Sequence, residues 1–172
     1  MSVVAVKKSE NKLVFASDSI KVSGWTKQSD KVLPKDMAKL FELNDMVIGS
    51  VGYSKELSFM RIFAATHKPK SPSVEGLLDF IIEFYSWAMR IDPEFERSNE
   101  YLIGFENKVF RITEGYLVDK VNEISAIGAG EDFALAAMHL GHSAIEAVEV
   151  ANELCLYCAP PICVIEKTLS QE

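Results

Sequence analysis

The sequence opens with residues 1–18, MSVVAVKKSENKLVFASD. This stretch contains two short runs of β-branched and other apolar residues, at positions 3–6 and 13–15. The polar segment 7–12 lies between them and carries a serine and an asparagine, which favour turns. The pattern predicts a β-hairpin whose first strand begins at residue 2 or 3. We therefore expect the α-amino group at the start of this strand to be held against the body of the fold.

Length and composition are those of an ordinary folded protein. The 172 residues suit one domain, so we expect residues 1–172 to share a core. Hydrophobic residues make up 48% and charged residues 25% of the chain, and no apolar run approaches the roughly 18 residues that a membrane span needs. Lys7 and Lys8 follow an apolar run that is too short for a signal peptide. The sequence therefore predicts a cytoplasmic protein without a membrane partner.

The charge of the chain argues against a nucleic-acid partner. The net charge of −7 comes from 25 acidic and 18 basic residues, and the only basic block is the pair Lys7 and Lys8. Phosphate binding needs clustered positive charge, which this sequence does not provide.

The three cysteines, Cys155, Cys158 and Cys163, are an odd number in a chain large enough to fold without disulfides. This favours free thiols. The spacing of Cys155 and Cys158 also occurs in zinc and redox sites. However, both belong to the predicted apolar helix that starts at residue 144 and ends at about residue 157, with Cys158 at its very end. Buried cysteine is common, so we favour packing thiols over metal ligands.

Hydrophobic periodicity and turn residues predict the order of elements along the chain. Residues 24–35 are polar and predict an exposed loop, whereas Asn44 and Asp45 form a two-residue hairpin turn. Helix 74–90 is apolar on more than one face, so we expect a sheet and a neighbouring helix, or a second subunit, to cover it. Strands are predicted at 3–6, 13–15, 19–23, 40–43, 46–48, 101–105, 109–112, 116–118, 123–127 and 162–165, and helices at 55–67, 74–90, 131–140 and 144–157. This order predicts an α+β fold in which two mainly antiparallel sheets lie between two helical layers.

Several segments together resemble the proteasome β-subunit superfamily, and most of all its HslV-like peptidases. These are VVAVKK at 3–8, VFASD at 14–18, KLFEL at 39–43 with Ile48-Gly49, AIGAG at 126–130, FALAA at 133–137 and ANELC at 151–155. The resemblance implies an N-terminal-nucleophile hydrolase with a four-layer αββα sandwich. It also implies a homo-oligomeric ring enclosing a proteolytic chamber, peptide or unfolded-protein substrates, an AAA+ unfoldase as a partner, and no required cofactor.

In that family the first residue of the mature chain is a threonine. Its hydroxyl attacks the peptide carbonyl, and its own α-amine takes the proton. An α-amine suits this task because its reference pKa of about 7.7–8.0 lies near working pH. By motif match, Asp18 and Lys39 provide electrostatic support for the nucleophile, and the Gly49 N–H is the oxyanion donor.

Two registers of the hairpin place different residues at the nucleophile. If Met1 is removed, Ser2 becomes the N-terminal residue, and the separation of 16 between Ser2 and Asp18 is the one that the family keeps. A direct match of VAVKK to the family's first strand instead places Met1 there, with one extra residue in the turn 9–12. Because side chains alternate along a strand, the two registers put Ser2 on opposite faces.

Two further positions depart from the family pattern. Ala129 stands where the family has a serine that contacts the terminal amine, and an alanine side chain can neither donate nor accept a hydrogen bond. Glu153 matches a family aspartate with a longer side chain. In some relatives, backbone carbonyls after this last helix bind a monovalent cation, which here would lie near Asn152, Cys155 and Cys158.

The sequence thus predicts a proteasome-like peptidase with Ser2 as its nucleophile, of the class known as threonine-type endopeptidases. The alternative is a degenerate relative that keeps the fold and the ring as a scaffold or binding subunit. A third hypothesis is a hydrolase of small amides on the same fold.

Overall fold

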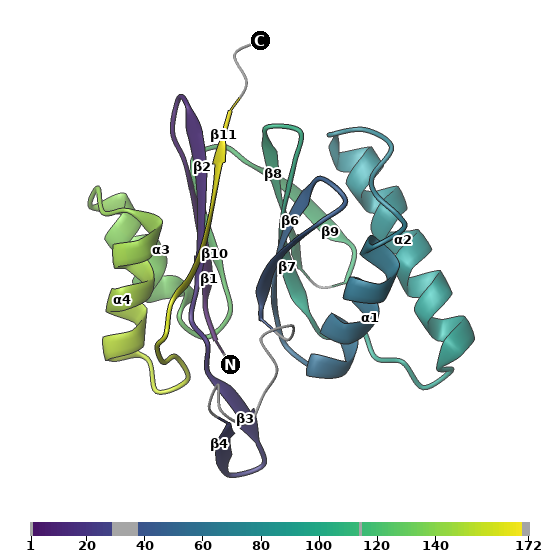
Figure 1. Cartoon of the computed structure of the whole chain (residues 1–172), viewed down its shortest axis with the longest axis horizontal. Helices are drawn as coiled ribbons and strands as arrows, with labels where there is room; N and C mark the ends of the chain where they lie inside the picture. The colour runs from purple at the N-terminus through teal and green to yellow at the C-terminus, as the bar shows by residue number, and fades with distance from the viewer. Residues whose placement is uncertain (1, 29–37, 114, 170–172) are drawn as a thin grey trace.

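The computed structural model describes residues 2–28, 38–113 and 115–169, and these form four layers (Figure 1). Helices α1 (Ser54–Ala64) and α2 (Val74–Ile91) cover one outer face, and α3 (Glu131–His139) and α4 (Ala144–Leu154) cover the other. Two antiparallel sheets lie face to face between the helix pairs. The predicted α+β class and the αββα sandwich are confirmed.

The first sheet has the strand order β10-β1-β2-β11. Strand β1 (Val4–Lys8) pairs with β2 (Lys12–Ser17) on one side and with β10 (Ile124–Ile127) on the other. Strand β11 (Cys163–Thr168) adds to the outer edge of β2. The predicted hairpin is therefore confirmed, and its first strand is held between two neighbours.

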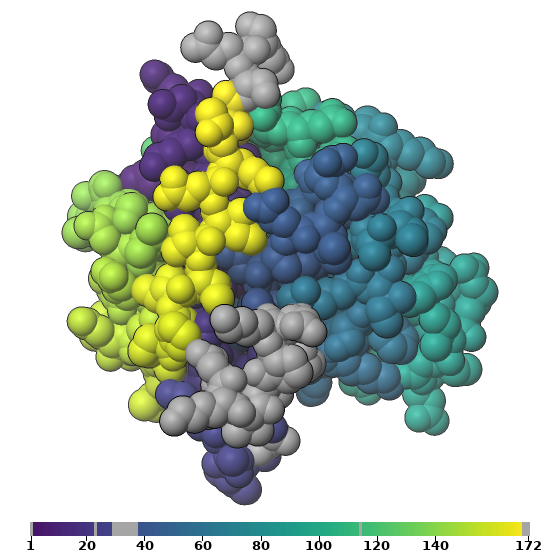
Figure 2. All heavy atoms as spheres, viewed as in Figure 1, coloured from purple at the N-terminus to yellow at the C-terminus, as the bar shows by residue number. Residues whose placement is uncertain are grey.

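The second sheet has the order β5-β6-β7-β8-β9. Its strands are β5 (Leu40–Leu43), β6 (Met46–Val51), β7 (Glu100–Phe105), β8 (Lys108–Thr113) and β9 (Leu117–Val121). Asn44 and Asp45 connect β5 to β6 with φ of 51° and 66°, as the predicted two-residue turn requires. In Figure 2, β11 (yellow) runs along the seam between the two sheets, where Lys167 forms an ion pair with Glu42 of β5.

Three apolar clusters fill the spaces between the layers. One packs the second sheet against α1 and α2, and another packs the first sheet against α3 and α4. The third lies between the two sheets and includes Val4 and Val6 of β1, whereas Val3 and Ala5 face α3 and α4. Side chains of β1 thus alternate between the two spaces, as the pleat of a strand requires.

Helix α2 buries one apolar face and exposes part of another. Leu77, Phe80 and Phe84 are buried against the second sheet and α1. Ile82 and Met89 lie outside that contact, with 44% and 39% of their surface exposed. The first predicted alternative is therefore observed, because the second sheet and α1 cover this helix together. Cover of its exposed residues by a second subunit stays a prediction.

Several element boundaries differ from the prediction, among them those of the loop 24–35 and of the last helix. Strand β4 (Thr26–Gln28) lies inside the predicted loop 24–35 and pairs with β3 (Lys21–Ser23), which precedes it. The two strands can pair because Gly24 adopts a positive φ of 57° and turns the chain back. Residues 29–35 of that loop lie outside the described residues. Helix α4 ends at Leu154 instead of residue 157, since Cys155 has an extended backbone.

The two cysteines that we placed in the last helix consequently lie after it. Cys155 caps α4, and Cys158 closes the following turn by donating its N–H to the Cys155 carbonyl. The three cysteines are free thiols, as predicted, and Cys155 and Cys158 are buried.

Candidate active site

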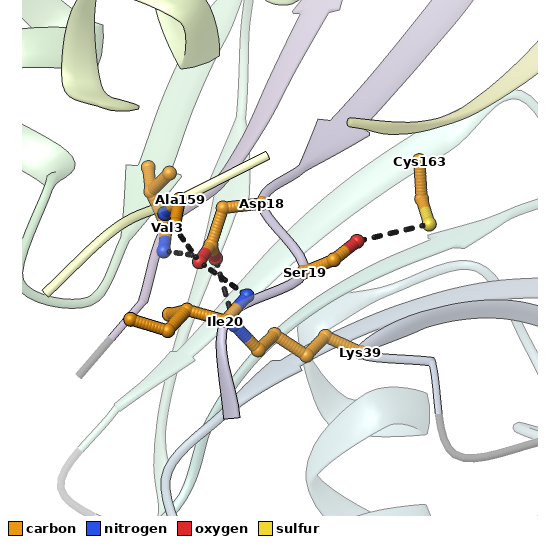
Figure 3. Close-up of polar contacts among 7 residues, drawn as sticks. All are labelled: Val3, Asp18, Ser19, Ile20, Lys39, Ala159 and Cys163. Atoms are coloured by element: carbon orange, nitrogen blue, oxygen red, sulfur yellow. Dashed lines mark hydrogen bonds and ion pairs between the residues drawn. The ribbon is translucent and has the colours of Figure 1, made fainter. Parts of the chain in front are cut away.

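The Asp18 carboxylate is the centre of the predicted site. It follows β2 directly, is 1% exposed, and accepts four hydrogen bonds (Figure 3). Its Oδ1 accepts from Val3 N at 2.9 Å and from Lys39 Nζ at 2.8 Å. Its Oδ2 accepts from Ile20 N at 3.0 Å and from Ala159 N at 3.3 Å. Asp18 therefore connects three parts of the chain by hydrogen bonds: the start of the first strand, the segment after β2 and the loop before β11. It also binds the ammonium group of Lys39.

Lys39 lies immediately before β5 and is 8% exposed. Burial lowers the pKa of its ammonium group, while the Asp18 carboxylate opposes this by favouring the charged form. The structure thus brings together the two residues that we predicted as electrostatic support, and it places a lysine with a lowered pKa beside the start of the chain.

Ser2 lines the same pocket as Lys39. The residue is 3% exposed, and its carbonyl accepts from Gly130 N at 3.1 Å. Residue 2 lies an even number of positions before Val4 and Val6, whose side chains face the space between the sheets. In a regular strand its side chain would face the same space. Met1, the residue of the rival register, lies outside the described residues.

Gly49 does not lie at the pocket. We placed it where the second strand ends, but β6 continues to Val51 because Ser50 N donates to Lys39 O and Val51 pairs with Glu100. Gly49 pairs with Leu40 on one side and Leu102 on the other, so its peptide groups face neighbouring strands. A Cβ there would lie 2.5 Å from Val4 Cγ1, which explains the glycine by close packing of the sheets.

Gly52, rather than Gly49, lines this pocket, while the oxyanion role that we predicted for Gly49 stays a prediction. Gly52 follows β6, precedes α1, and lines the pocket together with Ser2 and Lys39. The Ser50 N–H donates to the Lys39 carbonyl. Because peptide N–H groups alternate along a strand, we infer that the Gly52 N–H, two residues further on, points to the same side. Its φ of 133° and the lack of space for a Cβ both require glycine. A sequence signal existed, because Gly52 directly precedes the helical pattern.

The turn 128–130 lies against Ser2. Gly130 donates its N–H to the Ser2 carbonyl, and a Cβ on Gly128 would come within 2.5 Å of the same oxygen. Ala129, at the tip of this turn, is exposed, and its carbonyl accepts a weak hydrogen bond from Cys155 Sγ at 3.4 Å. The structure thus places Ala129 near the start of the chain, where the resemblance implies a serine.

Glu153 is not brought to the pocket. It is exposed near the end of α4, and no hydrogen bond or ion pair between described residues joins it to Ser2, Asp18 or Lys39. Its neighbour Asn152 differs, because among the described residues its Oδ1 atom is buried without a hydrogen-bond partner. An unpaired carbonyl oxygen fits a hard monovalent cation, so Asn152 and the carbonyls after α4 are compatible with the ion that the resemblance implies.

Glu56 and Asn99 are two buried polar residues that our sequence analysis missed. Asn99 lines the pocket with Ser50 and Tyr53, and Glu56 of α1 accepts hydrogen bonds from the backbone of Ser98 and Asn99. An acidic residue in the first turn of a helix predicts only an interaction with the helix dipole, so no local pattern indicates that Glu56 is buried.

The strand order and the four layers are those of the proteasome-like αββα fold. No protein-family model matches the chain, and no curated protein matches it. In the described residues, no helix is both long and apolar enough to cross a bilayer.

Among solved structures, the chain is similar to BPH of Thiobacillus denitrificans, with a TM-score of 0.84 and 18% sequence identity. The match covers 99% of this chain and 100% of that one. The same protein in complex with epoxomicin gives a TM-score of 0.84 and 18% identity over 98% and 100% of the two chains. HslV from Trypanosoma brucei gives 0.67 and 20% over 95% and 98%. At these identities the comparison establishes the fold.

Proposed function

We propose that this protein is a proteasome-like peptidase that cleaves peptide bonds with Ser2 as its N-terminal nucleophile, after removal of Met1. The observation that carries the proposal is that Ser2, Lys39 and Gly52 line one pocket, while Asp18 binds both Lys39 and the Val3 N–H. This supports the proposal, because a hydroxyl residue, a lysine and a backbone segment with peptide N–H groups line one pocket at the start of β1.

The chemistry follows from these positions. The Ser2 α-amine takes the proton of the Ser2 hydroxyl, whose oxygen attacks the carbonyl carbon of the substrate. The oxyanion that forms is stabilised by the Gly52 N–H, and the ammonium group of Lys39 favours both the alkoxide and the neutral amine. The proton then passes to the leaving amine, so that an ester remains on Ser2. Water attacks that ester and regenerates the hydroxyl.

The cellular part of the proposal follows the family resemblance. The chain would form a cytoplasmic homo-oligomeric ring with the pocket facing an internal chamber, and an AAA+ unfoldase would deliver unfolded protein. The exposed apolar residues Ile82 and Met89 on α2 support burial between subunits. A monovalent cation, where present, would contribute local positive charge near Asn152, and no step depends on it.

A second candidate is a scaffold or binding subunit that has lost the chemistry. Two observations favour it. Ala129 cannot hydrogen-bond the amine through its side chain, and Glu153 is exposed away from the pocket. Both remove partners that the family resemblance assigns to the terminal amine, whereas Asp18 and Lys39 are retained.

The deciding experiment is the intact mass of the purified protein before and after an epoxyketone such as epoxomicin. An epoxyketone has two electrophilic carbons, so an N-terminal residue with a hydroxyl and an amine can attack both. We expect a chain that lacks Met1 and gains one inhibitor mass. Ser2→Ala should lose the label, and the matched control Ser9→Ala, in the exposed hairpin turn, should keep it.

Retained Met1 with no adduct would contradict the enzyme and favour the scaffold. Turnover of small amides without cleavage of an unfolded protein would instead support the third hypothesis. Ring assembly is tested separately by sedimentation, where a monomer at micromolar concentration would contradict it.

A further inference from the structure

A buried polar network lies behind the turn that carries Gly52. Asn99 is 3% exposed, and its Oδ1 accepts from Tyr53 N. Its Nδ2 donates to Ser50 Oγ and to Tyr53 O, each at 3.1 Å. One amide side chain therefore binds both peptide groups of Tyr53 and a side chain of β6. This contact fixes the backbone on either side of Gly52.

The backbone at Gly52 packs directly against the Asn99 side chain. A Cβ on Gly52 would lie 2.1 Å from Asn99 Oδ1 and 3.0 Å from Asn99 Cα, so the backbone of the turn rests directly on Asn99. A positive φ of 133° is rarely held by a free loop, because many other conformations compete with it. The amide contacts at Tyr53 and Ser50 select this one.

Asn99 is in turn held by Glu56. The carboxylate is 2% exposed, and its Oε2 accepts from Ser98 N at 2.8 Å and from Asn99 N at 3.1 Å. Its Oε1 accepts from Tyr101 OH at 2.9 Å and from Tyr85 OH at 3.2 Å. Glu56 belongs to α1, which begins directly after the turn, so the helix start and the segment before β7 are locked to one another.

We propose that Glu56 and Asn99 are positioning residues for the oxyanion donor: Asn99 holds the Gly52–Tyr53 turn so that the Gly52 N–H faces the pocket, and Glu56 fixes Asn99. Neither residue acts on the substrate directly. Their contribution is to keep a donor in place before the charge develops, which is where such a donor is most effective. This inference rests on the function proposed above.

The test combines turnover with hydrogen exchange of the peptide that spans residues 50–54. In Asn99→Ala we expect kcat to fall about 10- to 100-fold with KM nearly unchanged, because a displaced donor affects the transition state more than substrate binding. Exchange in residues 50–54 should rise, while exchange in β2 stays as in wild type. Glu56→Ala should behave similarly but more weakly, and Glu56→Gln should restore most of kcat because glutamine can still accept from the Asn99 N–H.

A matched control separates positioning from general destabilisation. Ser143→Ala removes the side-chain cap of α4, on the opposite outer layer, and should lower stability without changing kcat or exchange at 50–54. Should Asn99→Ala fail to fold, the pair Glu56→Ala and Glu56→Gln still decides the question. Unchanged exchange at 50–54 in the variants, or raised exchange with unchanged kcat, would overturn the inference. A wild-type protein that neither cleaves peptides nor takes the epoxyketone would instead defeat the proposed function, and the inference with it.

Discussion

Asp18 and Glu56 are both buried carboxylates that accept four hydrogen bonds, but their donors differ in kind. Asp18 faces three peptide N–H groups and the ammonium group of Lys39, none of which can accept a hydrogen bond. Glu56 faces two peptide N–H groups and two phenols, and a phenol oxygen can also accept. Both oxygens at position 18 must therefore accept, which requires a carboxylate. At position 56 only the oxygen that faces the two peptide N–H groups must accept.

The two carboxylates also differ in whether their negative charge has a role. The Asp18 carboxylate compensates a buried cation beside the pocket, so its role includes the local field. Glu56 has neutral donors, and its role is to hold segments that lie far apart in the chain. Variants that keep shape while removing charge should therefore affect the two centres unequally.

The largest effect is expected for Asp18→Asn. The amide nitrogen must face donors whichever way the side chain is turned, and Lys39 loses its partner while still buried. Breaking a buried ion pair costs about 3–5 kcal/mol of unfolding free energy, and we expect activity to be lost as well. Urea unfolding and epoxyketone labelling measure the two effects. A variant as stable and as reactive as wild type would mean that the pair carries no net stabilisation.

The next largest effect is expected for Glu56→Ala, with Glu56→Gln well below it. Alanine leaves buried N–H groups unpaired, each worth about 1–3 kcal/mol, although water entering the space would reduce the total. Glutamine can accept from Ser98 and Asn99 while donating to the two phenols, so we expect a loss of about 1 kcal/mol or less. Unfolding free energies of the two variants check this. If glutamine costs as much as alanine, the charge of Glu56 is essential and the contrast with Asp18 fails.

The two centres also differ in how far the sequence predicts them. Alternation and turn residues predict the hairpin of β1 and β2, and the family resemblance then identifies Asp18 and Lys39, because both lie in recognisable motifs. Burial of Glu56 depends on Tyr85, Ser98 and Tyr101, which are 29 to 45 residues away. No local pattern reports such distant partners, so a buried network of this kind is found only in the fold.

The predictions that were wrong about individual residues share one physical cause. Gly49 and Gly52 are three residues apart in one apolar stretch, and only the pairing of Val51 with Glu100 shows that the strand passes Gly49. Cys155 and Cys158 continue an apolar pattern past the end of α4, and only the extended backbone at Cys155 ends the helix there. Local sequence patterns predict that a strand or helix exists better than they predict where it ends. The residues around the pocket lie at such ends.

A smaller effect is expected from pH at the Asp18 centre. Burial lowers the pKa of Lys39 below its ordinary value of 10.5. Between the lowered pKa and 10.5 the unfolded chain therefore binds more protons than the folded one, and stability from this group increases as pH rises. The pKa values of Tyr85 and Tyr101 are raised by burial and by Glu56, so near their ordinary pKa of 10.0 the unfolded chain loses phenol protons that the folded chain keeps, and this contribution falls as pH rises. Wild type and Lys39→Met share these phenols, so the contribution cancels when the two are compared.

We therefore expect the stability of wild type relative to Lys39→Met to increase as pH rises toward 10.5, the ordinary pKa of a lysine. Chemical unfolding at several pH values measures this difference, and groups shared by both proteins cancel. Asp18→Asn removes the main influence that raises the pKa of Lys39, so in that background the increase should begin at lower pH. A difference that is constant with pH, or that falls, would show that Lys39 titrates in the folded protein as it does in the unfolded chain.

The smallest effect tests whether the phenols of the Glu56 centre bind a charge. Tyr101 OH lies 2.9 Å from Glu56 Oε1 and Tyr85 OH lies 3.2 Å from it, so Tyr101→Phe should cost more than Tyr85→Phe, about 1–2 kcal/mol. In the Glu56→Gln background the same substitution should cost less, since a neutral hydrogen bond is roughly half as strong as a charge-assisted one. The double-mutant cycle of Tyr101→Phe and Glu56→Gln isolates this coupling. An equal cost in both backgrounds would mean that the carboxylate acts there as a neutral acceptor would, and that of the two centres only Asp18 depends on its charge.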